Sequence, residues 1–145
     1  MRLLVQRVSK AHVEVGQKVV GSIQAGILVL FGVRKGDTLE EVRWLANKVL
    51  NFRIFSDEDE KMNRSLLDIS GSLLVVSQFT LYADCSEGRR PSFTNAASPD
   101  LARKLYDAFI TEVKKSQIVV ETAIFGEKME VHLINDGPVT FILEK

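Results

Sequence analysis

Apolar and polar residues alternate along the first part of the chain with the spacing that is typical of half-buried β-strands. The alternation covers residues 1–9, continues through residues 13–15 to a turn at Gly16-Gln17, and returns over residues 19–23. Residues 27–31 are apolar at every position, which is typical of a strand buried on both faces. The opening third is therefore predicted to be mostly sheet.

Two later segments have apolar residues at helical spacing. The first is predicted to begin at Asp37 or Thr38, because Thr38 and Glu41 have the spacing of a capping box. The second is predicted to begin at Ser98-Pro99, a favourable N-cap followed by proline in the first turn. The apolar stripes are Leu39, Val42, Ala46, Val49 and Leu50 in the first helix, and Leu101, Leu105, Ala108, Phe109 and Val113 in the second.

The remaining apolar runs predict short strands. These runs are residues 52–55, 73–76, 118–123, 129–134 and 139–143. No repeat, linker or low-complexity tract divides residues 1–145, so one domain is expected. The order of elements predicts an α+β fold with a sheet packed under two helices.

Composition narrows the function classes. The chain has 145 residues with 19 basic and 19 acidic side chains, so a protein that coats nucleic acid with its whole surface is not expected. Cys85 is the only cysteine, which excludes an intrachain disulfide. The N-terminus lacks the apolar region of a signal peptide, and no uncharged stretch reaches the length of a membrane span. We expect a cytoplasmic protein that does not contact a membrane.

Several kinds of catalytic site are not expected. The chain has no phosphate loop, no dinucleotide-binding glycine motif and no nucleophile elbow. His12 and His132 lie far apart in sequence and on the polar faces of their strands, which favours structural or surface roles. With a single cysteine, Cys85, that has no nearby histidine, neither a zinc site nor a thiol catalyst is expected. We expect no metal and no organic cofactor.

Polar residues interrupt the apolar pattern at Ser77-Gln78-Phe79-Thr80-Leu81. If this segment is an extended strand, Gln78 and Thr80 share one face, while Ser77, Phe79 and Leu81 share the other. A carboxamide beside a hydroxyl at the end of a strand can orient a polar substrate. The alternative is an ordinary sheet edge in which threonine is favoured by propensity.

Two other segments carry candidate chemistry. Asn135-Asp136-Gly137 is typical of a hairpin turn, but the following Pro138 leaves an accessible backbone whose carbonyls can act as a selectivity wall. Residues 89–93 place Arg89 and Arg90 near an aromatic ring, a combination that can hold phosphate and stack a base. A plain solvated loop is the alternative for that segment.

These segments resemble the D-aminoacyl-tRNA deacylase family of the bacterial and eukaryotic type. The matching stretches are residues 5–8, 32–37, 51–55, 61–63, 77–81, 88–93 and 135–140, which span almost the whole chain. The resemblance implies an α+β fold with a mixed or antiparallel, barrel-like sheet packed with two main helices. It also implies hydrolysis of the ester that joins a D-amino acid to the 3′-terminal adenosine of tRNA.

The resemblance further implies a homodimer with sites at its interface. Gly137 and Pro138 match a Gly-cis-Pro pair that projects into the partner's site and excludes an L side chain, while glycine, having no side chain, is accepted. Gln78, Phe79 and Thr80 are the expected catalytic residues, since the tRNA 2′-hydroxyl can activate water while backbone N–H groups stabilise the oxyanion. The other expected contacts are Ser77, Phe125 and Met129 for the substrate, and Arg89 and Arg90 for tRNA.

Two alternatives remain at this point. Thr80 is the family's candidate nucleophile, so covalent catalysis is possible, although no histidine or lysine lies next to it in the sequence. The second alternative is a non-catalytic binding protein of the same fold that recognises RNA or a chromatin-associated factor. Phe125 and Met129 have core packing as an alternative role.

Overall fold

The computed structural model describes all residues from Met1 to Lys145 and contains a six-stranded sheet, a two-stranded sheet and two long helices. The strands are β1 (Arg2–Val15), β2 (Lys18–Ile23), β3 (Gly26–Gly32), β4 (Phe55–Ser56), β5 (Met62–Arg64), β6 (Ser72–Ser77), β7 (Val120–Thr122) and β8 (Glu130–Glu144). The helices are α1 (Leu39–Asn51), the 3₁₀ helix η1 (Phe79–Tyr82) and α2 (Pro99–Lys114). None of the helices is both long and apolar enough to cross a membrane.

Strand β1 organises the large sheet. It pairs antiparallel with β8 along one edge, and along the other edge it pairs first with β3 and then with β2. Parallel pairing continues the sheet from β3 to β6 and from β6 to β7. The sheet curls so that β2 approaches β7, and a Cβ atom on Gly21 would lie 2.7 Å from the Thr122 carbonyl oxygen. The mixed, nearly closed barrel confirms the predicted fold class.

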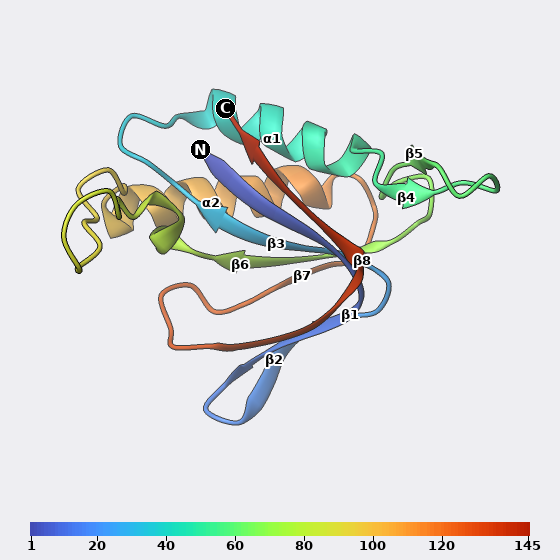
Figure 1. Cartoon of the computed structure of the whole chain (residues 1–145), viewed down its shortest axis with the longest axis horizontal. Coiled ribbons are helices and arrows are strands. Elements are labelled where there is room, and N and C mark those ends of the chain that lie inside the picture. The colour runs from blue at the N-terminus through green and yellow to red at the C-terminus, as the bar shows by residue number, and fades with distance from the viewer.

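Both long helices lie side by side over one face of the sheet (Figure 1). Ile27 and Val29 of β3 pack towards the helices, in a cluster that includes Leu45 and Phe109. Leu28, on the opposite face of β3, belongs to a second cluster inside the barrel. Because both faces of β3 are covered, the strand is apolar throughout, as its sequence predicts.

The predicted helices are confirmed, with their N-caps. Thr38 caps α1 in a capping box, with the Thr38 N–H donating to the Glu41 carboxylate at 2.7 Å. Ser98 caps α2, and Pro99 occupies the first turn. One member of the first predicted stripe differs, because the Leu39 side chain is 41% exposed at the start of α1.

The strand expected over residues 52–55 is mostly wrong, because only Phe55 of that run belongs to a strand, β4. Two further local interpretations are wrong, and both concern segments with candidate chemistry. The strand expected to run through residues 77–81 stops at Ser77, and the chain turns into η1. The hairpin alternative at Asn135–Gly137 is also excluded, because residues 130–144 form the single strand β8 along β1. A long partner strand holds both halves of β8 in one ladder, which the local turn signal does not reveal.

Candidate active site

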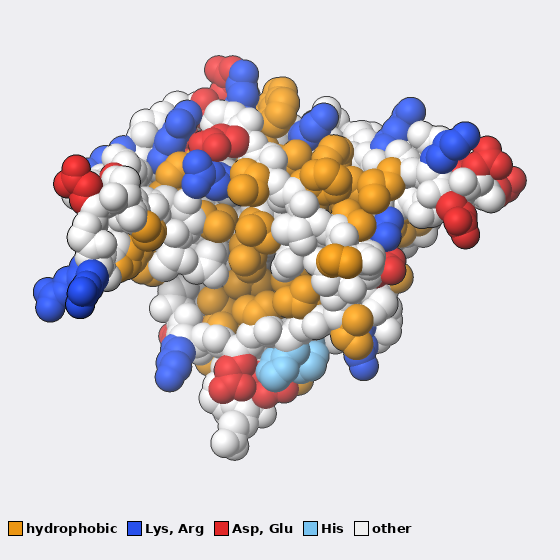
Figure 2. Space-filling view, viewed as in Figure 1, with side chains coloured by type: hydrophobic (Ala, Val, Ile, Leu, Met, Phe, Trp, Pro, Cys, Tyr) orange, Lys and Arg blue, Asp and Glu red, His pale blue; other side chains and the backbone are white.

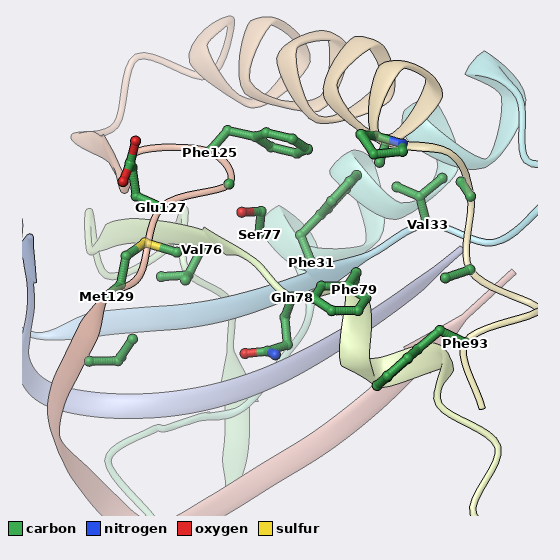
Figure 3. A pocket seen from close by; sticks show the side chains of 16 residues that line it. Phe31, Val33, Val76, Ser77, Gln78, Phe79, Phe93, Phe125, Glu127 and Met129 are labelled. Atoms are coloured by element: carbon green, nitrogen blue, oxygen red, sulfur yellow. The ribbon is translucent and has the colours of Figure 1, made fainter. Parts of the chain in front are cut away.

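A largely apolar cavity of about 540 Å³ opens where β6 ends and α2 begins (Figure 3). Its walls come from the ends of β3 and β6, from the start of α2, and from the segment that leads into β8. The lining residues are Phe31, Val33, Val76, Ser77, Gln78, Phe79, Phe93, Ala96, Ala97, Pro99, Ala102, Phe125, Gly126, Glu127, Met129 and Val131. A few polar groups among many apolar ones are typical of a small-ligand site.

The turn from β6 into η1 places the polar groups at this cavity. Ser77 pairs with Phe31 of β3, and the next N–H, that of Gln78, donates to the Phe31 carbonyl at 2.8 Å. The Gln78 carboxamide then donates a hydrogen bond to the Thr80 hydroxyl. Gln78 and Thr80 therefore lie together, as expected, but through a 3₁₀ turn in place of an extended strand.

The start of η1 also leaves two backbone donors free. The N–H groups of Phe79 and Thr80 donate to no acceptor within the chain, whereas the Leu81 N–H already bonds the Gln78 carbonyl. The first N–H groups of a helical turn have no partner within that turn. Arg2 fixes the other end of η1 by donating to the Leu81 carbonyl at 2.7 Å. The turn can thus present two fixed donors to a developing oxyanion.

An aromatic pair forms one side of the opening. The Phe79 ring is 57% exposed and the Phe93 ring is 39% exposed, and their centroids lie 5.0 Å apart. Both rings line the cavity (Figure 3). Exposed aromatic faces at an opening can stack a flat ligand such as a base.

Phe125 and Met129 line the opposite wall. The Phe125 ring packs against Tyr106 with centroids 5.6 Å apart, and the Arg103 guanidinium lies 5.2 Å from the Phe125 ring centroid. Phe125 therefore contacts the core and also faces the cavity. Glu127 adds a carboxylate to this wall that the sequence analysis did not identify.

No histidine, lysine or tyrosine lines the cavity, and Glu127 is the only carboxylate in its wall. Neither His12 nor His132 lines it. Burial raises the pKa of Tyr82, which follows Leu81 in η1, to about 12. Burial also raises the pKa of Tyr106, whose hydroxyl donates to the Val75 carbonyl at 2.8 Å. Both phenols therefore stay protonated near neutral pH, and proton transfer must involve another group.

Gly137 and Pro138 lie in a long bulge of β8, residues 136–139. The pairs Gln6–Thr140 and Val8–Asn135 leave residues 136–139 opposite Arg7 alone. The Gly137–Pro138 peptide bond is cis, as the family resemblance implied, and Gly137 has φ +143°.

Side chains on either side hold this bulge in place. The Asn135 side chain accepts from the Val139 N–H at 2.7 Å, and Arg7 donates to the Asp136 carbonyl at 2.9 Å. Gly137 and Pro138 are both exposed, and neither lines the cavity of its own chain. This bulge, residues 136–139, is exposed except at Val139 and is called the elbow below.

Arg89 and Arg90 lie in the loop between η1 and α2, which projects at the left of Figure 1. A pair of backbone hydrogen bonds between Asp84 and Ser92, at 2.7 and 2.9 Å, closes the base of this loop. Both arginines are exposed and neither forms an ion pair. Phe93, at the end of the same loop, connects it to the cavity opening.

The sequence analysis missed much of the cavity wall. Phe31 ends an apolar run that predicts core and Val33 follows it, while Ala97 and Ala102 flank the start of a helix. Their signal was weak, because small and apolar residues at such positions are ordinary packing residues.

Comparison with known proteins places this geometry in a family. The D-Tyr-tRNA(Tyr) deacylase family profile matches residues 4–144. The chain is 56% identical over 144 residues to the D-aminoacyl-tRNA deacylase of Thermosipho africanus, covering 99% of this chain and 97% of that one. It is 55% identical over 145 residues to the D-aminoacyl-tRNA deacylase of Exiguobacterium sibiricum, covering all of both chains.

Two solved structures have the same fold. One is described as c-Myc DNA Unwinding Element Binding Protein, with a TM-score of 0.94, 38% identity, and coverage of 100% of this chain and 99% of that one. The other is described as a probable eukaryotic D-amino acid tRNA deacylase, with a TM-score of 0.82, 20% identity, and coverage of 98% and 97%. The second likeness concerns the fold alone.

Proposed function

The chain belongs to the D-Tyr-tRNA(Tyr) deacylase family, and we propose that it hydrolyses D-aminoacyl-tRNA. Water adds to the ester carbonyl, the bond to the ribose oxygen breaks, and free D-amino acid and tRNA leave. The observation that carries this proposal is the match to D-aminoacyl-tRNA deacylases over the whole chain. The cavity lined by Gln78 and Phe79, with Thr80 hydrogen-bonded to Gln78, supplies a place for the reaction. Because charged tRNA is the substrate, we place the protein in the cytoplasm.

The chemical step is substrate-assisted in this proposal. The 2′-hydroxyl of the terminal adenosine activates the attacking water, since no histidine or lysine lines the cavity. The free N–H groups of Phe79 and Thr80 stabilise the oxyanion. Gln78 and Thr80, joined by their hydrogen bond, orient the ester, and Ser77 supports the wall behind it. Covalent attack by Thr80 is the alternative mechanism.

Selection for the D enantiomer comes from the elbow of a second copy of the chain. The elbow lies outside its own cavity and is exposed, so it is available to a partner. Large apolar side chains flank it on β8, with Ile134 52% exposed and Ile142 61% exposed, which favours burial in a homodimer. Its main-chain carbonyls fix the substrate amino group and fill the space that an L side chain needs. Glycyl-tRNA is accepted because glycine has no side chain to exclude.

The tRNA backbone lies along the loop that carries Arg89 and Arg90. Neither guanidinium has a carboxylate partner, so both are free to bind phosphate. The Phe79 and Phe93 rings stack the terminal base at the cavity opening. Phe125 and Met129 contact the aminoacyl group from the other wall.

A second candidate function is nucleic-acid binding without catalysis. It is favoured by the 38% identity to the protein described as c-Myc DNA Unwinding Element Binding Protein. Incubation of the chain with D-tyrosyl-tRNA separates the two candidates. The proposed enzyme releases free D-tyrosine with multiple turnovers, whereas a binding protein retards the tRNA in a gel and leaves the ester intact.

A further inference from the structure

Two histidines that are distant in sequence lie against each other on the outer surface of the barrel. His12 of β1 and His132 of β8 are directly paired in the strand register. Their rings are stacked with centroids 4.5 Å apart and an interplanar angle of 4°. Figure 2 shows the pale-blue pair beside red acidic side chains at the lower edge of the molecule. The alternation of β1 and β8 explains why both rings face outward, away from the barrel interior.

Two glutamates complete the cluster. Glu14 and Glu130 are also paired in register, two residues from the histidines and therefore on the same face. Oε1 of Glu14 lies 3.2 Å from Nε2 of His12, and Oε2 of Glu130 lies 3.8 Å from Nε2 of His132. Ligand atoms of His12, Glu14 and His132 all lie within 4.8 Å of one another. Two imidazoles and one carboxylate thus form a compact cluster on adjacent strands, with the Glu130 carboxylate beside it.

The two carboxylates of this cluster favour the binding of a cation. Carboxylates placed directly opposite each other on paired strands repel, and Glu14 and Glu130 are such a pair. Two imidazole nitrogens with one or two carboxylate oxygens form a donor set that suits Zn²⁺. Tetrahedral coordination needs donor atoms about 3.3 Å apart for Zn–N distances of about 2.0–2.1 Å. Because the two rings are stacked nearly parallel, at least one imidazole must rotate out of the stack for both to bind one ion. The side chains are partly exposed and have room for this rotation, and water completes the shell.

We propose that His12, His132 and Glu14, with Glu130 as an outer or fourth ligand, form a binding site for a divalent transition-metal ion of the Zn²⁺ type. The site lies apart from the cavity of the proposed enzyme. A bound ion fastens β8 to β1 between Met129, which lines the cavity, and the elbow at Gly137. The sequence pattern predicted no metal site, because the two histidines meet only through the long pairing of β1 with β8.

The test is calorimetric titration of the metal-free full chain with Zn²⁺, in a Cys85→Ser background that removes the exposed thiol as a competing ligand. We expect one ion per chain, and binding at least about 10-fold weaker in His12→Asn and in His132→Asn, since loss even of an outer-shell group costs that much. Glu14→Gln also weakens binding. At a Zn²⁺ concentration about 100 times Kd, Tm should rise by about 5–10 °C.

A matched control comes from the acidic loop between β4 and β5. Glu58→Gln removes a carboxylate from a competing cluster of four acidic residues and should leave Zn²⁺ binding unchanged. Circular dichroism verifies that each variant is folded. Absence of binding at millimolar Zn²⁺, or equal affinity in the parent and both histidine variants, overturns the proposal. A loss of binding in Glu58→Gln that matches the loss in the histidine variants also overturns it.

Discussion

The Gln78 carboxamide donates a hydrogen bond to the Thr80 hydroxyl across the first turn of η1. Only a bend of the chain after Ser77 makes this contact possible, and the same bend leaves the Phe79 and Thr80 N–H groups without acceptors. The proposed orienting groups and oxyanion donors therefore come from one short segment at the edge of the cavity. The proposed chemistry depends on this turn and on a hydroxyl supplied by the substrate.

The first prediction concerns the substrate's 2′-hydroxyl. D-Tyrosyl-tRNA that ends in 2′-deoxyadenosine should be hydrolysed at least about 100-fold more slowly than the normal substrate, because a group in acid–base catalysis contributes about 10²–10⁴-fold. Single-turnover hydrolysis rates with saturating protein measure the chemical step. Equal rates for the two substrates contradict the substrate-assisted mechanism.

Thr80→Ala is the matched change on the protein. Loss of the Thr80 hydroxyl should slow hydrolysis of the normal substrate by about 2- to 10-fold, since one orienting hydrogen bond is worth about 0.5–1.5 kcal/mol. A folded Thr80→Ala protein that binds substrate but has no turnover favours covalent catalysis by Thr80. Measurements of both changes together separate the two mechanisms.

The second prediction concerns the elbow itself. Gly137→Ala places a Cβ atom 2.6 Å from Cγ2 of Val139 and 2.8 Å from the Val139 nitrogen, at a backbone φ of +143°. We expect a loss of more than about 1 kcal/mol in the free energy of unfolding and a lower preference for D over L substrates. Denaturant unfolding and paired deacylation rates measure the two effects.

Gly16→Ala is the control for this change. Gly16 also has a positive φ, +54°, but a Cβ atom there would have no neighbour within 4 Å, and the turn lies outside the cavity. This variant should lose some stability and keep its preference for D substrates. If Gly137→Ala keeps that preference as well, the elbow does not select the enantiomer.

The third prediction concerns pH and the cap of α1. Hydrogen bonds from Thr38, first its side chain and then its backbone, lower the pKa of Glu41 from 4.5 to about 2. Because the pKa is lowered in the folded state, the ionised carboxylate stabilises the fold above pH 4.5, and this contribution is lost as pH falls towards 2. Thr38→Ala should therefore lower the free energy of unfolding by about 1 kcal/mol near neutral pH. Between pH 4.5 and pH 2, the free energy of unfolding of this variant should depend less on pH than that of the parent.

Urea unfolding between pH 2 and pH 7 measures this effect. Thr38→Ser keeps a capping hydroxyl and should behave like the parent. If the free energy of unfolding of Thr38→Ala falls with pH as steeply as that of the parent, the ionisation of Glu41 is not the cause of this pH dependence.

The fourth prediction concerns assembly. Ile142→Asp introduces a charge on the exposed face of β8, next to the elbow in the strand, where the side chain is 61% exposed. In the proposed homodimer this change should dissociate the subunits, and activity should fall together with the fraction of dimer in sedimentation. Val119→Asp changes a comparably exposed residue, 58%, in the segment after α2 and should have neither effect. A fully active monomer would refute a partner-supplied elbow.

Local sequence patterns predicted the helices and most strands well. Thr38 and Ser98 cap their helices as expected, because capping depends on residues three positions apart. The all-apolar run of β3 correctly indicated burial on both faces. The helix caps and the burial of β3 depend on residues that are close together in the chain, so they can be predicted from one sequence.

The candidate site was predicted only in part, because its geometry depends on distant pairing. Gln78 and Thr80 lie together as expected. The turn that joins them follows from Phe31 of β3, whose carbonyl accepts from the Gln78 N–H. The continuous course of β8 past Gly137 depends on β1, and so does the stacking of His12 on His132. No local signal near any of these residues reveals the partner strand.

The central claim is that main-chain geometry selects the D enantiomer of the acyl group. The most direct measurement compares hydrolysis rates of D-tyrosyl-tRNA and L-tyrosyl-tRNA by the same protein preparation. We predict that the D substrate reacts at least about 100-fold faster, a difference of about 2.7 kcal/mol between the two transition states. Similar rates for both enantiomers would contradict the account.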